Sequence, residues 1–188
     1  MAGGIPAAEL EDFVKRYCIT DSIEIAARAA RNGVEMIQIR AKELPARAQT
    51  ELVRACGRFE SSRSKILVNT RADIALACHT DGVHLPAHSI SPTLIRGIAP
   101  PGFLVGVSCH GIEELRAAEQ EGADFVVFGP IFPTSSKSGP PLGIEALRKA
   151  VQSVERLPVF ALGGVTAENA GLCIEAGATG IAGISLFR

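Results

Sequence analysis

Short apolar runs, rich in β-branched and aromatic residues, alternate along this chain with longer amphipathic segments. Such runs are typical of strands buried on both faces of a parallel sheet. Eight are expected, at 16–20, 36–40, 65–69, 82–85, 104–108, 125–128, 158–161 and 180–184. Helices are expected between them, where apolar residues recur three or four apart, including 22–32, 45–60, 111–121, 143–154 and 168–176.

Four expected strands follow a glycine-bearing helix exit of related form, "RNGVEM", "TDGVHL", "EGADFV" and "AGATGI". Glycine at a helix C-terminus turns the chain into the next strand, so these exits indicate a repeated βα unit. Eight units predict a single (β/α)₈ TIM barrel over residues 1–188, compact and lacking the last helix after "SLFR". A doubly wound open sheet is the alternative, but the strand count and the absence of an early G-x-G-x-x-G favour the barrel.

The composition of the chain indicates which class of molecule it binds. The 188 residues are 47% hydrophobic, enough for one domain core, and carry a formal charge of -1, which does not suggest nucleic acid or a membrane surface. A small solute is expected instead. The five cysteines form no C-x-x-C pair, and no apolar stretch reaches 18 residues, so we expect a cytoplasmic protein with reduced thiols.

Polar residues follow several expected strands, at the end of a parallel barrel where active sites are built. "QIRAK" places Gln38 and Arg40 on one face by period-two alternation, with Lys42 just beyond. Two cations and an amide suit a phosphate or diphosphate, although a solvated rim is the alternative.

Two further loops carry residues suited to an anion. "ALGGVT" leaves the seventh strand with glycines whose N–H groups can approach an anion closely, and "GISLF" ends the eighth strand. The loops after strands seven and eight form the common phosphate site of this fold, so Gly163, Gly164, Ile184 and Ser185 are the expected phosphate cradle. The loop after strand six resembles a lid over an anionic substrate, with Thr134, Ser135, Ser136 and Lys137.

The motifs "YCITD", "QIRAK", "VNTRADIALA", "DGVHL", "VGVSCHGIEELRAAEQEGADFVVFGPIFPTSSKSG" and "ALGGVTAEN" follow one another across nearly the whole chain. In this order they resemble the family of thiamine phosphate synthase and the TenI-type thiazole tautomerases. The resemblance implies a barrel enzyme of thiamine biosynthesis. A synthase joins a hydroxymethylpyrimidine diphosphate to a thiazole phosphate and releases diphosphate. Residues matching its diphosphate and pyrimidine site are Gln38, Arg40, Lys42, Asn69, Ser108, Thr134, Ser136 and Lys137, and those matching its thiazole-phosphate site are Gly164, Ile184 and Ser185.

One departure from the synthase pattern concerns magnesium. Synthases carry an aspartate directly after the strand-three asparagine and another after strand four; this chain has Thr70 at the first position and Ser89 near the second. Neutral hydroxyls are poor ligands for Mg²⁺, which favours a metal-independent thiazole tautomerase with no cofactor. Mg²⁺ is expected only if the chain is a synthase.

A tautomerase needs a group that moves a proton. The histidine of the best-known tautomerase pattern, just after the strand-six glycine, is Pro130 here. His84 and His110 are therefore the expected catalytic residues, since imidazole titrates near neutrality, with Cys109 weaker and His88 a possible contact to a substrate carboxylate. Either histidine could instead be a packing residue.

Three functions thus remain open: a tautomerase, favoured on the missing carboxylates; a synthase; and a non-catalytic barrel that binds thiazole or thiamine phosphates. All three expect small phosphorylated thiazole or pyrimidine compounds as partners. Apolar positions on the segment 22–32 allow a homodimer without requiring one.

Overall fold

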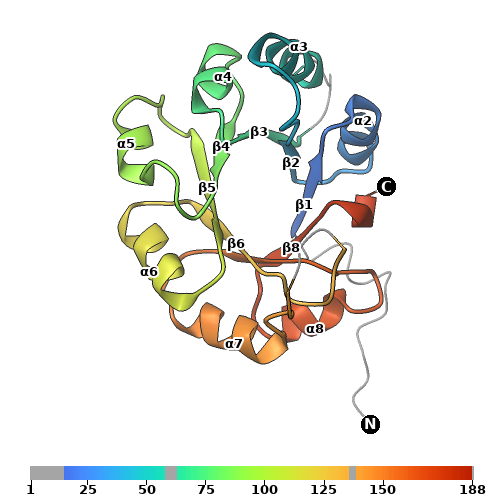
Figure 1. The fold of residues 1–188 in the computed structure, drawn as a ribbon, viewed down its shortest axis with the longest axis vertical. Coiled ribbons are helices and arrows are strands. Elements are labelled where there is room, and N and C mark those ends of the chain that lie inside the picture. The colour runs from blue at the N-terminus through green and yellow to red at the C-terminus, as the bar shows by residue number, and fades with distance from the viewer. Residues whose placement is uncertain (1–14, 58–62, 136–138, 188) are drawn as a thin grey trace.

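The strands of the computed structural model close into a barrel in chain order, and β1 also pairs with β8 (Figure 1). Residues 15–57, 63–135 and 139–187 are described. Every pairing is parallel, so the predicted TIM barrel is confirmed and the open sheet is wrong. The strands are β1 Lys15–Thr20, β2 Met36–Ile39, β3 Lys65–Asn69, β4 Gly82–Leu85, β5 Leu104–Cys109, β6 Phe125–Phe128, β7 Val159–Leu162 and β8 Gly180–Gly183.

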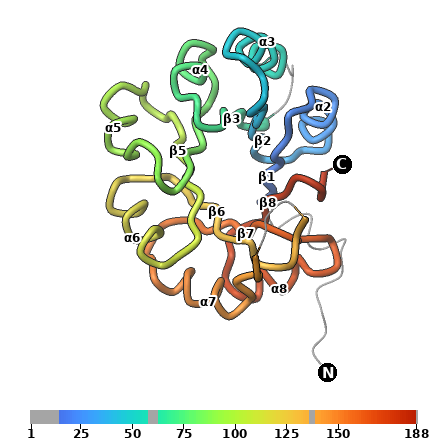
Figure 2. Tube along the Cα trace, viewed as in Figure 1, coloured from blue at the N-terminus to red at the C-terminus, as the bar shows by residue number. Residues whose placement is uncertain are grey.

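The helices form a ring outside the strands, and the chain passes around the barrel once (Figure 2). They are α2 Ile23–Arg31, α3 Ala46–Cys56, α4 Ala72–Ala77, α5 Pro92–Arg96, α6 Ile112–Gln120, α7 Ile144–Gln152 and α8 Ala170–Glu175. Within the described ranges, no helix is both long and apolar enough to cross a membrane.

Two short helices, α4 and α5, are hard to predict from the spacing of apolar residues. The helices α4 and α5 have six and five residues, so few apolar positions repeat within them; α8 has six residues too, but apolar spacing over 168–176 indicates it. The start of α5 does carry a signal, because Ser91 caps the helix and Pro92 follows at its first position. After β8 the described chain makes only the short 3₁₀ helix η1, Ser185–Phe187, where Arg28 of α2 donates to the Phe187 carbonyl oxygen.

Period-two alternation divides the strand side chains between two cores. One set lies inside the barrel, where Tyr17, Phe125 and Phe160 pack edge-on with Met36 and Leu67. The alternate set packs outward beneath the helices. Because the centre is filled, a ligand site can form only at an end of the barrel.

Carboxylates pin the amino ends of several strands. Asp81 accepts from the Ile66 N–H at 2.9 Å and from Lys65 Nζ at 2.7 Å. Asp124 repeats the arrangement with the Val105 N–H, at 2.6 Å, and with Arg96. These carboxylates lie at the amino ends of the strands, opposite the candidate site. Asp81 fixes the start of β4 against β3, and Asp124 fixes the start of β6 against β5.

Candidate functional site

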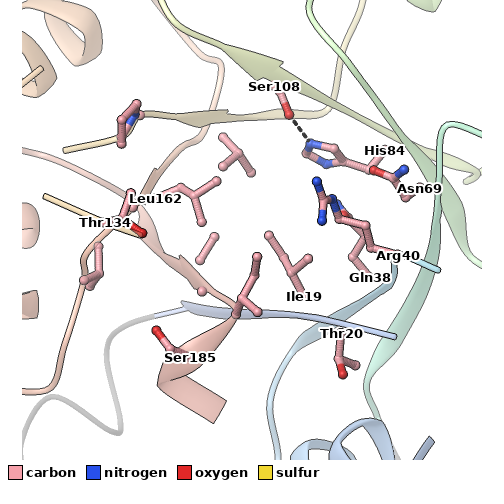
Figure 3. Close-up of a pocket in the computed structure, with 18 of the residues that line it drawn as sticks. Ile19, Thr20, Gln38, Arg40, Asn69, His84, Ser108, Thr134, Leu162 and Ser185 are labelled. Carbon is pink, nitrogen blue, oxygen red and sulfur yellow. Dashed lines mark hydrogen bonds between the residues drawn. The ribbon is translucent and has the colours of Figure 1, made fainter. Parts of the chain in front are cut away.

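A pocket of about 520 Å³ lies at the carboxyl ends of the strands. Its floor is the layer of inward side chains directly above the aromatic core, and this layer has two different halves (Figure 3). Strands β2 to β5 contribute Gln38, Asn69, His84 and Ser108, whereas β6 to β8 and β1 contribute Val127, Leu162, Ala182 and Ile19. A ligand in this pocket therefore meets a polar half and an apolar half.

Two cations stand over the polar half. Arg40, half-buried, and Lys42, exposed, both line the pocket just beyond β2, as predicted. The Arg40 N–H donates to the Thr20 carbonyl oxygen at 2.7 Å, which extends the β1–β2 ladder and holds the arginine at the pocket edge. Asp21, also in the lining, is the only carboxylate among the described lining residues. The polar half thus suits an anion.

The opposite wall consists of the residues predicted as a phosphate cradle, Gly163, Gly164, Ile184 and Ser185. Gly163 and Gly164 have φ of +97° and +64°, which glycine adopts without strain. A Cβ on Gly164 would lie 2.4 Å from the Pro133 carbonyl oxygen, so this backbone packs directly on the β6 loop. Asn169 holds the turn from behind by donating to the Gly164 carbonyl oxygen at 2.9 Å. The backbone here is rigid and close to the pocket.

The loop after β6 supplies part of the rim. Thr134 and Ser135 line the pocket, whereas Ser136 and Lys137, also predicted here, lie outside the described residues. The Leu142 N–H donates to the Pro130 carbonyl oxygen at 2.8 Å and tethers the loop as it returns to α7.

His84 lies in the floor and is linked to Tyr17 and Ser108 through its two ring nitrogens. Burial, with the Arg40 charge adding a smaller effect, lowers the pKa of His84 to about 3. Such an imidazole is neutral at physiological pH and is a weak base. The role of His84 as proton carrier stays a prediction, and this lowered pKa disfavours it.

His110 and His88 follow β5 and β4. His110 lines the pocket, and its Nδ1 donates to the Gly129 carbonyl oxygen at 2.6 Å. His88 is 89% exposed in its side chain and faces Glu114, with 3.6 Å between Nε2 and Oε1; it does not line the pocket. Cys109 is buried on the helix-facing side of β5 and does not line the pocket, and burial raises the pKa of its thiol to about 12.

The residues present do not fit a Mg²⁺ site. Thr70 stands where synthases carry one aspartate and Ser89 stands near the position of the other, and Ser89 does not line the pocket. In the described part of the chain, no three His, Cys, Asp or Glu side chains gather closely enough to hold a metal ion. Mg²⁺ prefers carboxylates together with substrate phosphates, and Asp21 alone does not supply a pair.

The structure brings the predicted residues onto one pocket: Gln38, Arg40, Lys42, Asn69, His84, Ser108, His110, Thr134, Gly163, Gly164, Ile184 and Ser185 all line it. What each of them does stays a prediction. Tyr17 and Asp21 were missed as individual residues, although both belong to "YCITD". Period-two alternation from β1 was the signal for Tyr17, because it places Tyr17 and Ile19 on the same face.

Comparison with known proteins agrees with the resemblance. The family described as thiamine monophosphate synthase matches residues 14–187. The chain is 40% identical to a putative thiamine-phosphate synthase 2 of Aquifex aeolicus, over 94% of this chain and 98% of that protein. It is 41% identical to a thiamine-phosphate synthase of Chlorobium luteolum, over 88% of this chain and 79% of that protein.

A solved structure shares both fold and sequence. The thiamine phosphate pyrophosphorylase from Pyrococcus furiosus superimposes with a TM-score of 0.82 at 35% identity, covering 94% of this chain and 88% of that one. The family match over residues 14–187 spans every residue that lines the pocket. The chain belongs to the thiamine monophosphate synthase family.

Proposed function

We propose that this enzyme is a thiamine phosphate synthase, which joins a hydroxymethylpyrimidine diphosphate to a thiazole phosphate. The observation that carries the proposal is the two-sided pocket, with Arg40 and Lys42 over its polar half and the Gly163–Gly164 backbone on the opposite wall. Two anionic groups can then bind at once, with two rings between them. The names of the relatives support the same activity.

The synthase reaction does not require a general acid or a general base. The bond between the pyrimidine methylene carbon and the diphosphate oxygen breaks, and its electron pair leaves with the diphosphate. The thiazole nitrogen lone pair forms the new bond to that carbon, and no proton moves. A neutral His84 is compatible with this step, whereas a tautomerase requires a group that titrates near the working pH.

Electrostatics then carries the catalysis. Arg40 and Lys42 balance the charge that grows on the departing diphosphate, and the partly enclosed pocket strengthens this attraction. The apolar half, with Val127, Leu162 and Ala182, holds the thiazole ring so that its nitrogen faces the methylene carbon. The described residues offer no carboxylate pair for Mg²⁺. Arg40 and Lys42 are therefore the groups of this chain that balance the charge of the diphosphate.

One observation favours the tautomerase as a second candidate. His110 donates to the Gly129 carbonyl oxygen, which brings an imidazole to the β6 glycine beside Pro130, the position of the histidine in the tautomerase pattern. A carbonyl can only accept, so Nδ1 carries the hydrogen. In neutral His110, Nε2 is then the basic nitrogen, as a general base requires.

The test is turnover of both substrate sets by purified protein. Thiamine phosphate is followed by fluorescence after oxidation, with pyrimidine diphosphate and thiazole phosphate, in Mg²⁺ and in chelator. Tautomerisation of the carboxylated thiazole phosphate is followed by chromatography. Thiamine phosphate formed in proportion to enzyme supports the synthase; tautomerisation alone, lost in His110→Ala, would replace it with the second candidate. If the protein catalyses neither reaction but binds the thiazole phosphate tightly, the non-catalytic barrel is the remaining function.

Variants test the roles in the proposed reaction. Arg40→Ala is expected to lower kcat about 100-fold, the usual effect of removing one group that stabilises developing charge. Arg47→Ala is the matched control, because the Arg47 side chain is 94% exposed on α3, pairs with Glu51 and does not line the pocket. Equal losses in both variants would contradict the assignment of Arg40.

The missing aspartates can be restored. The double variant Thr70→Asp with Ser89→Asp places an aspartate at the first position of the synthase pattern and near the second. We expect its turnover to rise with Mg²⁺ and to fall in chelator by a larger factor than that of the original chain. An identical metal response in the two proteins would show that these positions do not govern metal use.

A further inference from the structure

A chain of four hydrogen-bonding side chains runs beneath the polar half of the pocket. Gln38 Nε2 lies 3.0 Å from the Tyr17 oxygen, the Tyr17 oxygen lies 3.3 Å from His84 Nδ1, and His84 Nε2 lies 2.9 Å from Ser108 Oγ. Tyr17, Gln38 and His84 are at most 3% exposed, whereas Ser108 reaches the pocket, as Figure 3 shows for the bond from His84. The bonds therefore connect the closed barrel interior to the pocket.

The charge states in this chain restrict its hydrogens to two arrangements. Burial raises the pKa of Tyr17 far above its ordinary value, so the phenol keeps its hydrogen. His84 is neutral, so one ring nitrogen donates and the other accepts. Gln38 Nε2 is a donor only, so it donates to the Tyr17 oxygen in both arrangements. In the first direction Tyr17 donates to His84 Nδ1, and His84 Nε2 donates to Ser108. In the second direction Ser108 donates to Nε2, Nδ1 donates to the Tyr17 oxygen, and the buried Tyr17 hydrogen has no acceptor among these four side chains. Only the first direction leaves the Ser108 hydrogen available to a ligand.

The neighbouring charges select between these directions. Arg40 is the charged group that acts on His84, and with Lys42 it marks the polar half as a site for an anion. Phosphate oxygens are acceptors only, so they need a donor from Ser108. The first direction also gives the buried Tyr17 hydrogen an acceptor, His84 Nδ1.

These four side chains, Gln38, Tyr17, His84 and Ser108, form a hydrogen-bonded relay. Packing holds its two middle members, Tyr17 and His84, in place. The Tyr17 ring meets Phe125 and Phe160 edge-on, with centroids 5.4 and 6.2 Å away. Gly106 makes room for the imidazole, because a Cβ there would lie 2.8 Å from His84 Nδ1. Neither ring can turn away without displacing the core, so the phenol hydroxyl stays opposite Nδ1.

We propose that Tyr17 is a positioning residue, which holds His84 in its Nε2–H tautomer and thereby makes Ser108 a hydrogen-bond donor to the diphosphate substrate. This rests on the proposed function for the identity of the ligand. His84 then transmits orientation and exchanges no proton with substrate. Tyr17 acts on the reaction without touching it.

The first measurement is nitrogen NMR on protein labelled with ¹⁵N at histidine. Long-range proton–nitrogen correlations distinguish a protonated ring nitrogen from a bare one, and His84→Gln assigns the signals. We expect hydrogen on Nε2, a bare Nδ1 and no titration between pH 8 and 5. Hydrogen on Nδ1, or titration near pH 6.5, would overturn the proposal whether or not the protein is a synthase.

The second measurement uses Tyr17→Phe, which removes only the hydroxyl. We expect a mixture of His84 tautomers and a kcat about 10-fold lower, which corresponds to one hydrogen bond, with KM for the thiazole phosphate unchanged. Ser153→Ala, which removes a hydroxyl bonded to the Ala150 carbonyl oxygen away from the pocket, should change neither. An unchanged tautomer and kcat in Tyr17→Phe would refute the relay. If Tyr17→Phe does not fold, the NMR measurement of the His84 tautomer in the wild-type protein still tests the proposal.

Discussion

Thr70 has a backbone conformation that its side chain disfavours, and relieving this should stabilise the protein. Its φ is +65°, in the left-handed region, where a β-branched residue is strained. Two backbone hydrogen bonds hold it there: the Thr70 N–H donates to the His84 carbonyl oxygen at 2.8 Å, and the Ala72 N–H donates to the Thr70 carbonyl oxygen at 3.1 Å. The side chain is exposed, so substitution disturbs no core packing.

Asparagine is the substitution that isolates this strain. A non-glycine residue in the left-handed region costs about 1–3 kcal/mol, and asparagine tolerates it best. The Asn side chain can still accept the hydrogen bond that Asn69 Nδ2 now donates to Thr70 Oγ1 at 3.0 Å. Thr70→Asn should therefore raise the free energy of unfolding by about 1 kcal/mol, or the Tm by about 2–4 °C for a chain of this length.

The assay is urea unfolding followed by circular dichroism, supported by calorimetry. Thr166→Asn is the matched control, since Thr166 is also exposed but does not have a positive φ, and it should change stability by less than about 0.5 kcal/mol. A lower urea midpoint for Thr70→Asn, or an equal gain in Thr166→Asn, would refute the argument from strain.

Three further predictions concern pH, the phosphate wall and the opposite end of the barrel. Because the pKa of His84 is about 3 when folded and 6.5 in its ordinary state, the unfolded chain binds an extra proton between these values; unfolding free energy should fall by about 2 kcal/mol from pH 7.5 to 5. His84→Gln should remove this slope in urea titrations and His79→Gln should not. Gly164→Ala should raise KM for thiazole phosphate at least about 10-fold in steady-state assays, because φ is +64° and the new Cβ meets the Pro133 carbonyl oxygen at 2.4 Å; an unchanged KM would count against the cradle. Asp81→Ala leaves the Ile66 N–H without its carboxylate and should cost about 1–3 kcal/mol in the same titrations, whereas the exposed Glu51→Ala should cost almost nothing.

Much of the pocket could be predicted because the fold repeats one unit. Period-two alternation sends Gln38 and Arg40 to the face that becomes the pocket, and parallel strands place all their carboxyl ends together. The glycines at 163 and 164 could be assigned to the opposite wall from fold position alone. The short helices α4 and α5 gave a weaker periodic signal, although α8, also of six residues, was expected from the longer segment 168–176.

The preference between two family activities was harder to predict from the sequence. Thr70 and Ser89 favoured a tautomerase, and His84 was expected to carry its proton. The structure buries His84 near Arg40, where its pKa falls, and the relatives carry synthase names. A pKa depends on burial and on charges that lie close in space, and the residue type does not reveal either.

The sequence by itself determined the barrel, the family and the loops that line the pocket, because each follows from local periodicity or from motifs in one order. Only the tertiary structure decided that Tyr17 contacts His84, 67 residues further along the chain, and that Gln38 and Ser108 complete the relay. Barrel closure places these side chains together. Their protonation and hydrogen-bond direction follow from distance and burial, which exist only once the chain has folded.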